Sequence, residues 1–109
     1  MLGKPYRLRE KRLFQEVFSH GQRNFIQGVG CFSLPSKNGT LIGVTFTQRA
    51  FPRSVTRHYY KRLTLHIIRE LFPMLPPGKA LVFHFQRPLT PVSKEVLAPI
   101  LRTLLQRIR

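Results

Sequence analysis

The sequence predicts an α+β domain in which helices pack on a small β-sheet. The chain has 109 residues, which allows one small domain over residues 1–109. Its hydrophobic fraction of 42% is enough for a core, so a disordered basic tail is excluded. The hydrophobic pattern changes along the chain in the order helix, two or three strands, helix, strand, helix. This mixture of elements is typical of α+β architecture.

The first helix is predicted over residues 7–20. Phe14, Val17 and Phe18 have the i, i+3, i+4 spacing of one helical face. Gly21 follows as a residue that commonly ends helices. Three apolar residues on one face predict that this helix packs on the core.

Two strands are predicted next, over residues 25–34 and 41–47. Both are rich in aromatic and β-branched side chains. Residues 35–40 read PSKNGT, and the Asn38-Gly39 pair is a strong hairpin signal. The sequence therefore predicts that these two strands pair directly.

The second half predicts a helix over residues 55–72, a strand over residues 80–85 and a helix over residues 93–108. Prolines and a glycine at 73–78 end the first of these helices. Pro99 should bend the last helix or delay its start. The apolar stripe of that helix consists of Leu97, Ile100, Leu101, Leu104, Leu105 and Ile108.

Charge restricts the function classes strongly. Lys plus Arg is 19 and Asp plus Glu is 4, a formal net charge of +15. There is no Asp, and Glu10, Glu16, Glu70 and Glu95 are scattered, so a two-metal nuclease site or a paired-carboxylate glycosidase site is not expected. We expect no catalytic residues and no metal site in this chain.

Other sequence features concern the cellular setting. Cys31 is the single cysteine, which excludes a disulfide scaffold and fits a reduced, cytoplasmic protein. Residues 1–12 lack the apolar segment of a signal peptide, and no apolar run approaches the roughly 20 residues of a membrane span. The remaining partners for such a basic domain are nucleic acid and an anionic membrane surface.

The helix over residues 55–72 separates its side chains into two arcs. The arc predicted to face the sheet contains Tyr59, Tyr60, Leu63, Ile67 and Leu71. The opposite arc is cationic, is extended by Arg49 and Arg53, and contains Arg57, His58, Lys61, Arg62, His66 and Arg69. A solvated helix face usually mixes signs, whereas Glu70 is the single acid here, so a phosphate-binding ridge is predicted.

The histidines do not predict a catalytic or zinc site. His58 and His66 lie two turns apart on a helix with no Cys or paired acid beside them. His84 falls within the last strand, as a core or edge residue. No base partner is identified for Cys31, which is expected to be a buried small hydrophobe.

Three segments carry a resemblance to a known family. Residues 14–21 read FQEVFSHG, similar to a helix motif F-x-x-V-F-x-x-G. Residues 42–49 read IGVTFTQR, similar to a strand motif G-L-x-V-S/A-K-K, and residues 57–63 read RHYYKRL, similar to R-N-R-x-K-R-L. In this order and spacing, they resemble the protein subunit of bacterial ribonuclease P. The departures are Gln48, His58, Tyr59 and Leu65-His66, where the family has Lys, Asn, Arg and Arg-Glu.

The resemblance implies a fold and a partner set. The fold is a small mixed sheet in the order α-β-β-β-α-β-α with a left-handed β-α-β crossover, as in a ribosomal protein domain. The catalytic component is a large RNA that uses magnesium, bound mainly by that RNA, to release the 5′ leader of precursor tRNA. Ribonuclease P RNA and precursor tRNA are the implied partners, and no obligate protein partner is evident.

Site residues follow from the motifs and from the cationic ridge. Those assigned to the RNA subunit are Arg49, Arg53, Arg57, His58, Tyr59, Lys61 and Arg62. Those assigned to the precursor tRNA leader, in a cleft between the first helix and the sheet, are Arg12, Phe14, Phe18 and Phe32. Aromatic stacking combined with a cationic groove is a common way to hold single-stranded RNA. Phe32 is equally suited to the core.

Two other function classes remain open at this stage. One is a general RNA-binding or ribosome-associated module without a role in tRNA processing. The other is a membrane-surface protein that uses the apolar stripe of the last helix with Arg102, Arg107 and Arg109.

Overall fold

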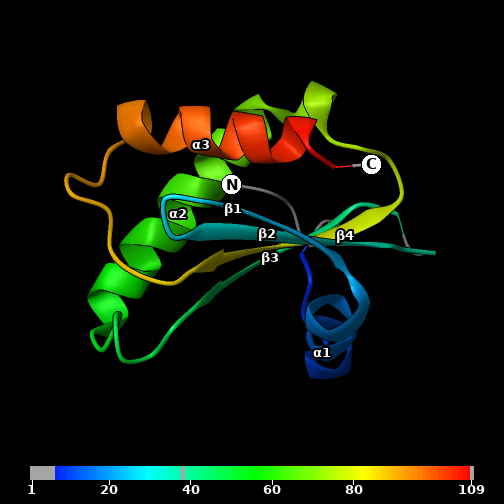
Figure 1. Ribbon diagram of the computed structural model, residues 1–109, viewed down its shortest axis with the longest axis horizontal. Coiled ribbons are helices and arrows are strands. Elements are labelled where there is room, and N and C mark those ends of the chain that lie inside the picture. Colours follow the sequence, from blue (N-terminus) through cyan, green and yellow to red (C-terminus); the bar gives the residue numbers. More distant parts are fainter. Residues whose placement is uncertain (1–6, 38, 109) are drawn as a thin grey trace.

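The computed structural model describes residues 7–37 and 39–108. A four-stranded sheet separates two helices on one side from one helix on the other (Figure 1). The predicted α+β class and element order are confirmed. In chain order the elements are α1 (Lys11–His20), β1 (Gln22–Ile26), β2 (Val29–Pro35), β3 (Leu41–Phe46), α2 (Ser54–Glu70), the 3₁₀ helix η2 (Phe72–Met74), β4 (Lys79–Phe85) and α3 (Lys94–Gln106).

The sheet has the order β1-β2-β4-β3, so β4 lies between two strands that precede it in the chain. β1 pairs antiparallel with β2, β2 pairs antiparallel with β4, and β3 pairs parallel with β4. The prediction that residues 25–34 and 41–47 form a hairpin is therefore wrong. Asn38 lies outside the described residues, while Gly39 has a φ of 80°. The turn reverses the chain, but the apolar strand β4 occupies the position between the two strands.

Residues 25–34 form parts of two strands rather than one. β1 ends at Ile26 and β2 begins at Val29, and these two residues pair across the turn. Gln27 and Gly28 both have positive φ, 50° and 84°, as a two-residue hairpin turn requires. The pattern of aromatic and β-branched residues continues through this turn, which is why the sequence reads as one strand.

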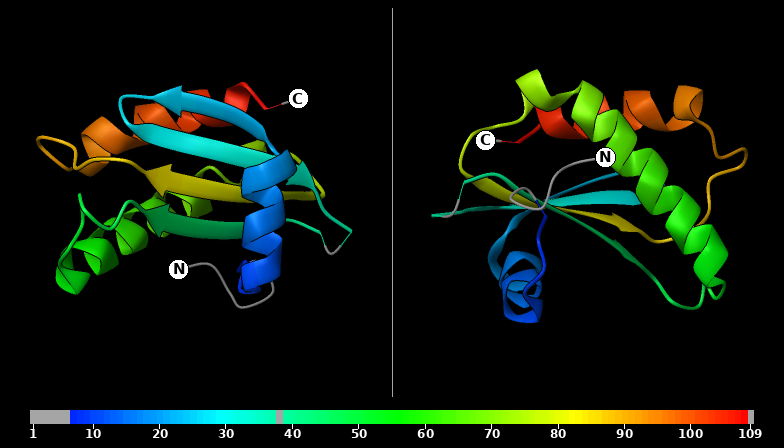
Figure 2. Two further views of the ribbon diagram at one scale, coloured as in Figure 1. Left: turned by 60° about the horizontal axis from the view of Figure 1, so that its bottom comes forward. Right: turned by 180° about the vertical axis from the view of Figure 1, so that it is seen from behind.

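The connection β3–α2–β4 joins parallel neighbours. In the left view of Figure 2, α2 lies behind the sheet and β3 and β4 point to the left, with β3 below β4. Seen from the α2 side with the strands pointing upward, the chain therefore passes from β3 on the right to β4 on the left. This is the left-handed crossover that the resemblance implied, against the usual right-handed rule.

Each face of the sheet has its own core. α2 and α3 cover one face, where the largest fully buried side chains include Phe51, Tyr60, Phe83 and Phe85. α1 covers only one end of the other face, above a smaller core that contains Phe32 (Figure 2, left). Among the residues that the structure describes, no helix covers the remainder of that face.

The helices differ from their predicted bounds at the ends. α1 begins at Lys11 instead of residue 7, because Arg7 bridges to Ile42 and the Leu8 amide donates to the Ile42 carbonyl oxygen along the outer edge of β3. α2 ends at Glu70, and Pro73 follows within η2. α3 begins at Lys94, so Pro99 does not delay its start.

The face of α2 that packs on the sheet is rotated from the predicted arc. Tyr60, Ile67 and Leu71 are buried as expected, and Thr64 and Leu65 are buried with them. Tyr59 was predicted to face the sheet, but 44% of its surface is exposed. Adjacent residues point about 100° apart on a helix, so Tyr59 and Tyr60 do not both reach the core.

Candidate RNA-binding surfaces

The cationic ridge of α2 is exposed along most of its length. Its exposed members from the N-cap to the last turn are Arg53, His58, Lys61, Arg62, His66 and Arg69. Arg49 is also exposed, in the turn that follows β3. Clustered cations with few acids beside them attract phosphate over distances of about 8–10 Å at physiological salt. The predicted cationic ridge is therefore an exposed surface of the folded protein, and its binding of phosphate stays a prediction.

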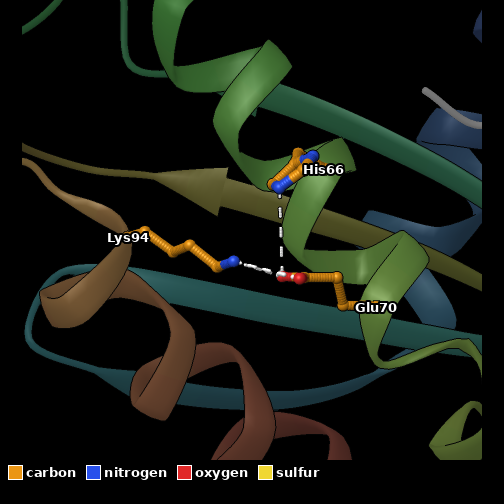
Figure 3. Close-up of polar contacts among 3 residues, drawn as sticks. All are labelled: His66, Glu70 and Lys94. Carbon is orange, nitrogen blue, oxygen red and sulfur yellow. Dashed lines mark hydrogen bonds and ion pairs between the residues drawn. The ribbon is translucent and has the colours of Figure 1, made fainter.

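The single acid of α2 is paired at the far end of this ridge. Glu70 Oε1 lies 2.8 Å from Lys94 Nζ and 4.0 Å from His66 Nε2, which links α2 to α3 (Figure 3). The hydrogen bond from Lys94 is the main cause that lowers the pKa of Glu70. This carboxylate thus neutralises Lys94 rather than the cations near the start of α2.

Arg57 differs from the other cations of α2 because it also supports the fold. Its Nη1 donates a hydrogen bond of 2.6 Å to the carbonyl oxygen of Phe51, and its side chain is half-buried. Phe51 is fully buried and packs edge-on against Tyr60. Arg57 therefore fixes the turn that carries Arg49 and Arg53 to the start of α2.

The residues predicted to hold the leader lie together at α1 and the sheet, in unequal roles. Phe18 is half-buried, and its ring centroid lies 4.7 Å from that of Phe32. Phe32 is only 6% exposed, so it supports Phe18 from below and has little surface for an RNA base. Phe14 is half-buried against Gly43. Arg12 is exposed, with its Nε 3.9 Å from Glu16 Oε1.

Sequence reasoning missed two aromatic side chains on this same face. Phe25 is 42% exposed and contacts Phe32 edge-on, with ring centroids 5.6 Å apart. His84 lies 5.8 Å from Phe18, measured between ring centroids, and partial burial lowers its pKa. Their positions depend on strand register. For His84, the sequence did contain a signal, because Ala80, Val82 and His84 alternate along β4 and so share one face of the sheet.

A cavity connects the two predicted sets of residues. It has a volume of about 240 Å³ and lies between the segment before α1, the edge of β3, and α2. Lys61 from the ridge and Phe14 from the leader set both line it, together with Arg7, Leu8, Arg9, Ile42, Gly43, Val44 and Leu65. We call the surface formed by Phe14, Phe18, Phe25 and Phe32 the aromatic face. The ridge and the aromatic face are therefore neighbours across the β3 edge.

The histidine, cysteine and acidic side chains of the described residues do not form a metal-binding cluster. Within residues 7–37 and 39–108, no three His, Cys, Asp or Glu side chains come together. Cys31 is buried, which raises the pKa of its thiol to about 12. Over the same residues, no helix has the length and apolarity needed to cross a membrane.

Comparison with known proteins gives one consistent result. The family model Ribonuclease P matches residues 2–109. A ribonuclease P protein component from a Synechococcus strain is 36% identical over 92 residues, covering 76% of this chain and 66% of the relative. One from a Cyanothece strain is 33% identical over 99 residues, covering 75% and 76%. The chain thus spans about two thirds to three quarters of these relatives.

Solved structures show the same fold at lower sequence identity. The ribonuclease P protein of Thermotoga maritima superposes with a TM-score of 0.83 at 21% identity, over 94% of this chain and 97% of that one. The Staphylococcus aureus protein gives 0.80 at 14% identity, over 93% of each chain.

Proposed function

Because the chain belongs to the ribonuclease P protein family, we propose that it is the protein subunit of a ribonucleoprotein that releases the 5′ leader of precursor tRNA. The family match over residues 2–109 is the observation that carries this proposal. In it, the RNA subunit performs the cleavage and the protein holds RNA in place. The protein acts in the cytoplasm, in keeping with its single, unpaired Cys31.

The geometry supports a protein that binds two RNA segments at once. The α2 ridge and the aromatic face lie on different sides of the β3 edge, with the cavity at Lys61 and Phe14 between them. In the proposal the ridge binds phosphates of the RNA subunit. The aromatic face beside α1 binds the single-stranded leader, where stacking needs no paired partner strand.

Magnesium in this proposal belongs mainly to the RNA subunit. The glutamates of the chain do not fit a magnesium site, because Glu10 and Glu16 lie at α1, Glu70 on α2 and Glu95 on α3. Cationic side chains and magnesium both neutralise RNA phosphate, so the protein should lower the magnesium concentration that cleavage requires.

The test begins with the RNA that copurifies with the protein from its own cells. That RNA, transcribed and purified, is assayed with precursor tRNA across a magnesium series, with protein alone, RNA alone and both together. We expect cleavage by RNA alone at high magnesium, none by protein alone, and a lower magnesium midpoint for the complex. An unchanged midpoint, or equal affinity of the complex for precursor and mature tRNA, would favour a general RNA-binding module.

A further inference from the structure

β1 is an edge strand of the sheet. Its strand partner is β2, and no other strand of the described residues pairs with its outer side. The edge at β3 differs, because Arg7 bridges to Ile42 and the Leu8 amide donates to the Ile42 carbonyl oxygen. The two edges lie at opposite ends of the sheet (Figure 2, left). An open edge strand can pair with a strand of another chain.

The register of the β1–β2 hairpin identifies the backbone groups that point outward. Ile26 and Val29 flank the two-residue turn, so they form a hydrogen-bonded pair. Hydrogen-bonded and non-hydrogen-bonded pairs alternate along an antiparallel ladder. Arg23 and Phe25 therefore occupy non-hydrogen-bonded positions of the hairpin, and the N–H and C=O groups of both residues point away from β2.

One register of two β1 strands uses all of these outward groups. When two copies pair antiparallel about a two-fold axis at Asn24, Arg23 of each copy lies opposite Phe25 of the other. Both of these pairs are hydrogen-bonded. A register centred on Arg23 or on Phe25 leaves outward groups unpaired, and the first of these also sets two arginines directly opposite each other, which is destabilising.

The side chains on one face of this pairing are complementary. Arg23 and Phe25 point to the face that α1 covers in part, and both are exposed. In the register centred on Asn24, the guanidinium group of each copy lies beside the aromatic ring of the other, where a cation is attracted to the ring. The Phe25 ring is held in place, because it lies so close over Gly30 that a Cβ atom there would be 2.5 Å from Phe25 Cε2.

Asn24 points to the opposite face, and its amide lacks a partner in the single chain. Its Nδ2 is buried and has no hydrogen-bond partner among the described residues. A buried donor that stays unpaired lowers stability. At the axis the two Asn24 residues form a non-hydrogen-bonded pair, which brings their Cα atoms to about 4.5 Å. Each carboxamide can then donate an N–H to the oxygen of the other.

The end of α3 leaves space on this side of β1. A cavity of about 520 Å³ is lined by Gln22, Asn24, Gln106, Arg107 and Ile108. In the register centred on Asn24, the second strand brings its own Asn24 and Ile26 to this face. The cavity therefore gives these side chains room beside the end of α3.

We propose that β1 is a self-association surface, at which two copies of the chain join their four-stranded sheets into one continuous sheet centred on Asn24. A second copy fits this edge because it supplies the same amide at the axis and places an aromatic ring, rather than a charge, beside Arg23. The α2 ridge and the β3 edge lie away from β1. The inference is therefore independent of the proposed function and is tested without RNA.

Sedimentation equilibrium of the protein alone measures self-association. Concentrations up to about 1 mM are needed, since one short strand pair buries little area and gives a weak interface. We expect a monomer–dimer equilibrium that shifts toward the dimer between about 50 mM and 200 mM salt, because salt screens the repulsion between two chains of net charge +15. RNA binding should weaken over the same range, so the two kinds of association respond oppositely to salt.

Two variants test the backbone pairing at position 23. Arg23→Pro removes an outward N–H, and proline is tolerated on an edge strand where the N–H faces solvent. Arg23→Ala is the matched control, because it loses the same charge but keeps the N–H. We expect Arg23→Pro to abolish the dimer and Arg23→Ala to weaken it several-fold at most.

A third variant tests the pairing of the two amides at the axis. Asn24→Asp keeps the shape of the side chain and lowers the net charge, which by itself reduces the repulsion between copies. It also sets two carboxylates directly opposite each other in place of two complementary amides. We therefore expect the dimer to weaken roughly 5- to 150-fold at pH 7.

Cross-linking tests the register. Cys31 is the single cysteine and is replaced by Ala, so that Asn24→Cys introduces the one thiol of the variant. The Cα separation of about 4.5 Å at the axis permits a disulfide, so mild oxidation should link two copies. Gln22→Cys is the matched control on the same face of β1. In this register it lies opposite Ile26 of the second copy, far from the other thiol, and should not link.

The outcomes decide between a second copy and other occupants of the edge. A protein that stays monomeric at every salt concentration, with equal linking of Asn24→Cys and Gln22→Cys, overturns the inference. A dimer that Arg23→Pro and Asn24→Asp leave unchanged uses another surface and overturns it as well. If thermal melting shows that Arg23→Pro does not fold, Asn24→Asp and the cross-linking pair decide. A monomer that binds an extended polyglutamate peptide through β1 would assign the edge to an acidic strand of another protein, contrary to the inference.

Discussion

Replacing Arg57 by Ala should weaken both RNA binding and the fold, whereas replacing Arg62 should weaken RNA binding alone. The difference lies in the 2.6 Å hydrogen bond from Arg57 Nη1 to the Phe51 carbonyl oxygen. Hydrogen bonds to charged groups contribute about 1.5–3 kcal/mol. Arg57 is only half-buried, so solvent screening reduces this to about 1–2 kcal/mol. Arg62 is exposed, and its removal should change the free energy of unfolding by no more than about 0.5 kcal/mol.

Thermal melting of both variants without RNA measures the structural part. For a domain of this size, about 1–2 kcal/mol corresponds to a Tm lower by roughly 4–8 °C. Salt titration of binding to the RNA subunit measures the electrostatic part, because each lost phosphate contact makes the log–log salt slope shallower by about 0.7–0.9. If the Tm of Arg57→Ala equals that of Arg62→Ala and of the unaltered protein, the structural role of Arg57 is refuted.

The remaining predictions concern the charge, two family departures and two rings. RNA affinity should fall steeply between 50 mM and 200 mM salt, and near-constant affinity in a filter-binding titration would contradict the phosphate ridge. His58→Asn with Tyr59→Arg should strengthen RNA binding and lower the magnesium midpoint of cleavage, since both side chains are exposed and one gains a charge. Phe32→Ala should lower the free energy of unfolding by about 3–5 kcal/mol in denaturant titrations, as expected for a buried ring. Burial lowers the pKa of His84 from 6.5, so its neutral form stabilises the fold above that pH. Stability should then fall as the pH drops from about 6.5 toward the folded-state pKa, and His84→Gln should reduce that fall in melts across the pH range.

Elements with strong local signals were predictable from sequence. β4 and α3 lie within two residues of their predicted bounds, and the apolar stripe of α3 packs in the core. The β1–β2 hairpin was missed because Gln27-Gly28 is a weaker turn signal than Asn38-Gly39. The stronger turn signal gave a wrong prediction of pairing. The sequence of a turn does not indicate whether a strand from later in the chain is inserted between the two strands that the turn joins, as β4 is between β2 and β3.

The same limit applies to the candidate site. The cations of α2 were identifiable because charged side chains on a helix face water unless they are paired. The positions of Phe25 and His84 were not, because these residues come onto one face of the sheet only through the register of the strands. The second role of Arg57 depends on where the turn after β3 places the Phe51 carbonyl, which helical periodicity does not address.

The position of β4 has a consequence for synthesis of the protein on the ribosome. Within the sheet, β2 and β3 are joined only through β4, so before residues 79–85 leave the exit tunnel the emerging chain lacks the strand that joins the β1–β2 hairpin to β3. The aromatic face and the support beneath α2 both need the completed sheet. Such non-local pairing is slow to form. A nascent chain therefore presents its basic segments without their folded arrangement, and gains the proposed RNA-binding surfaces in one late step when β4 enters between its neighbours.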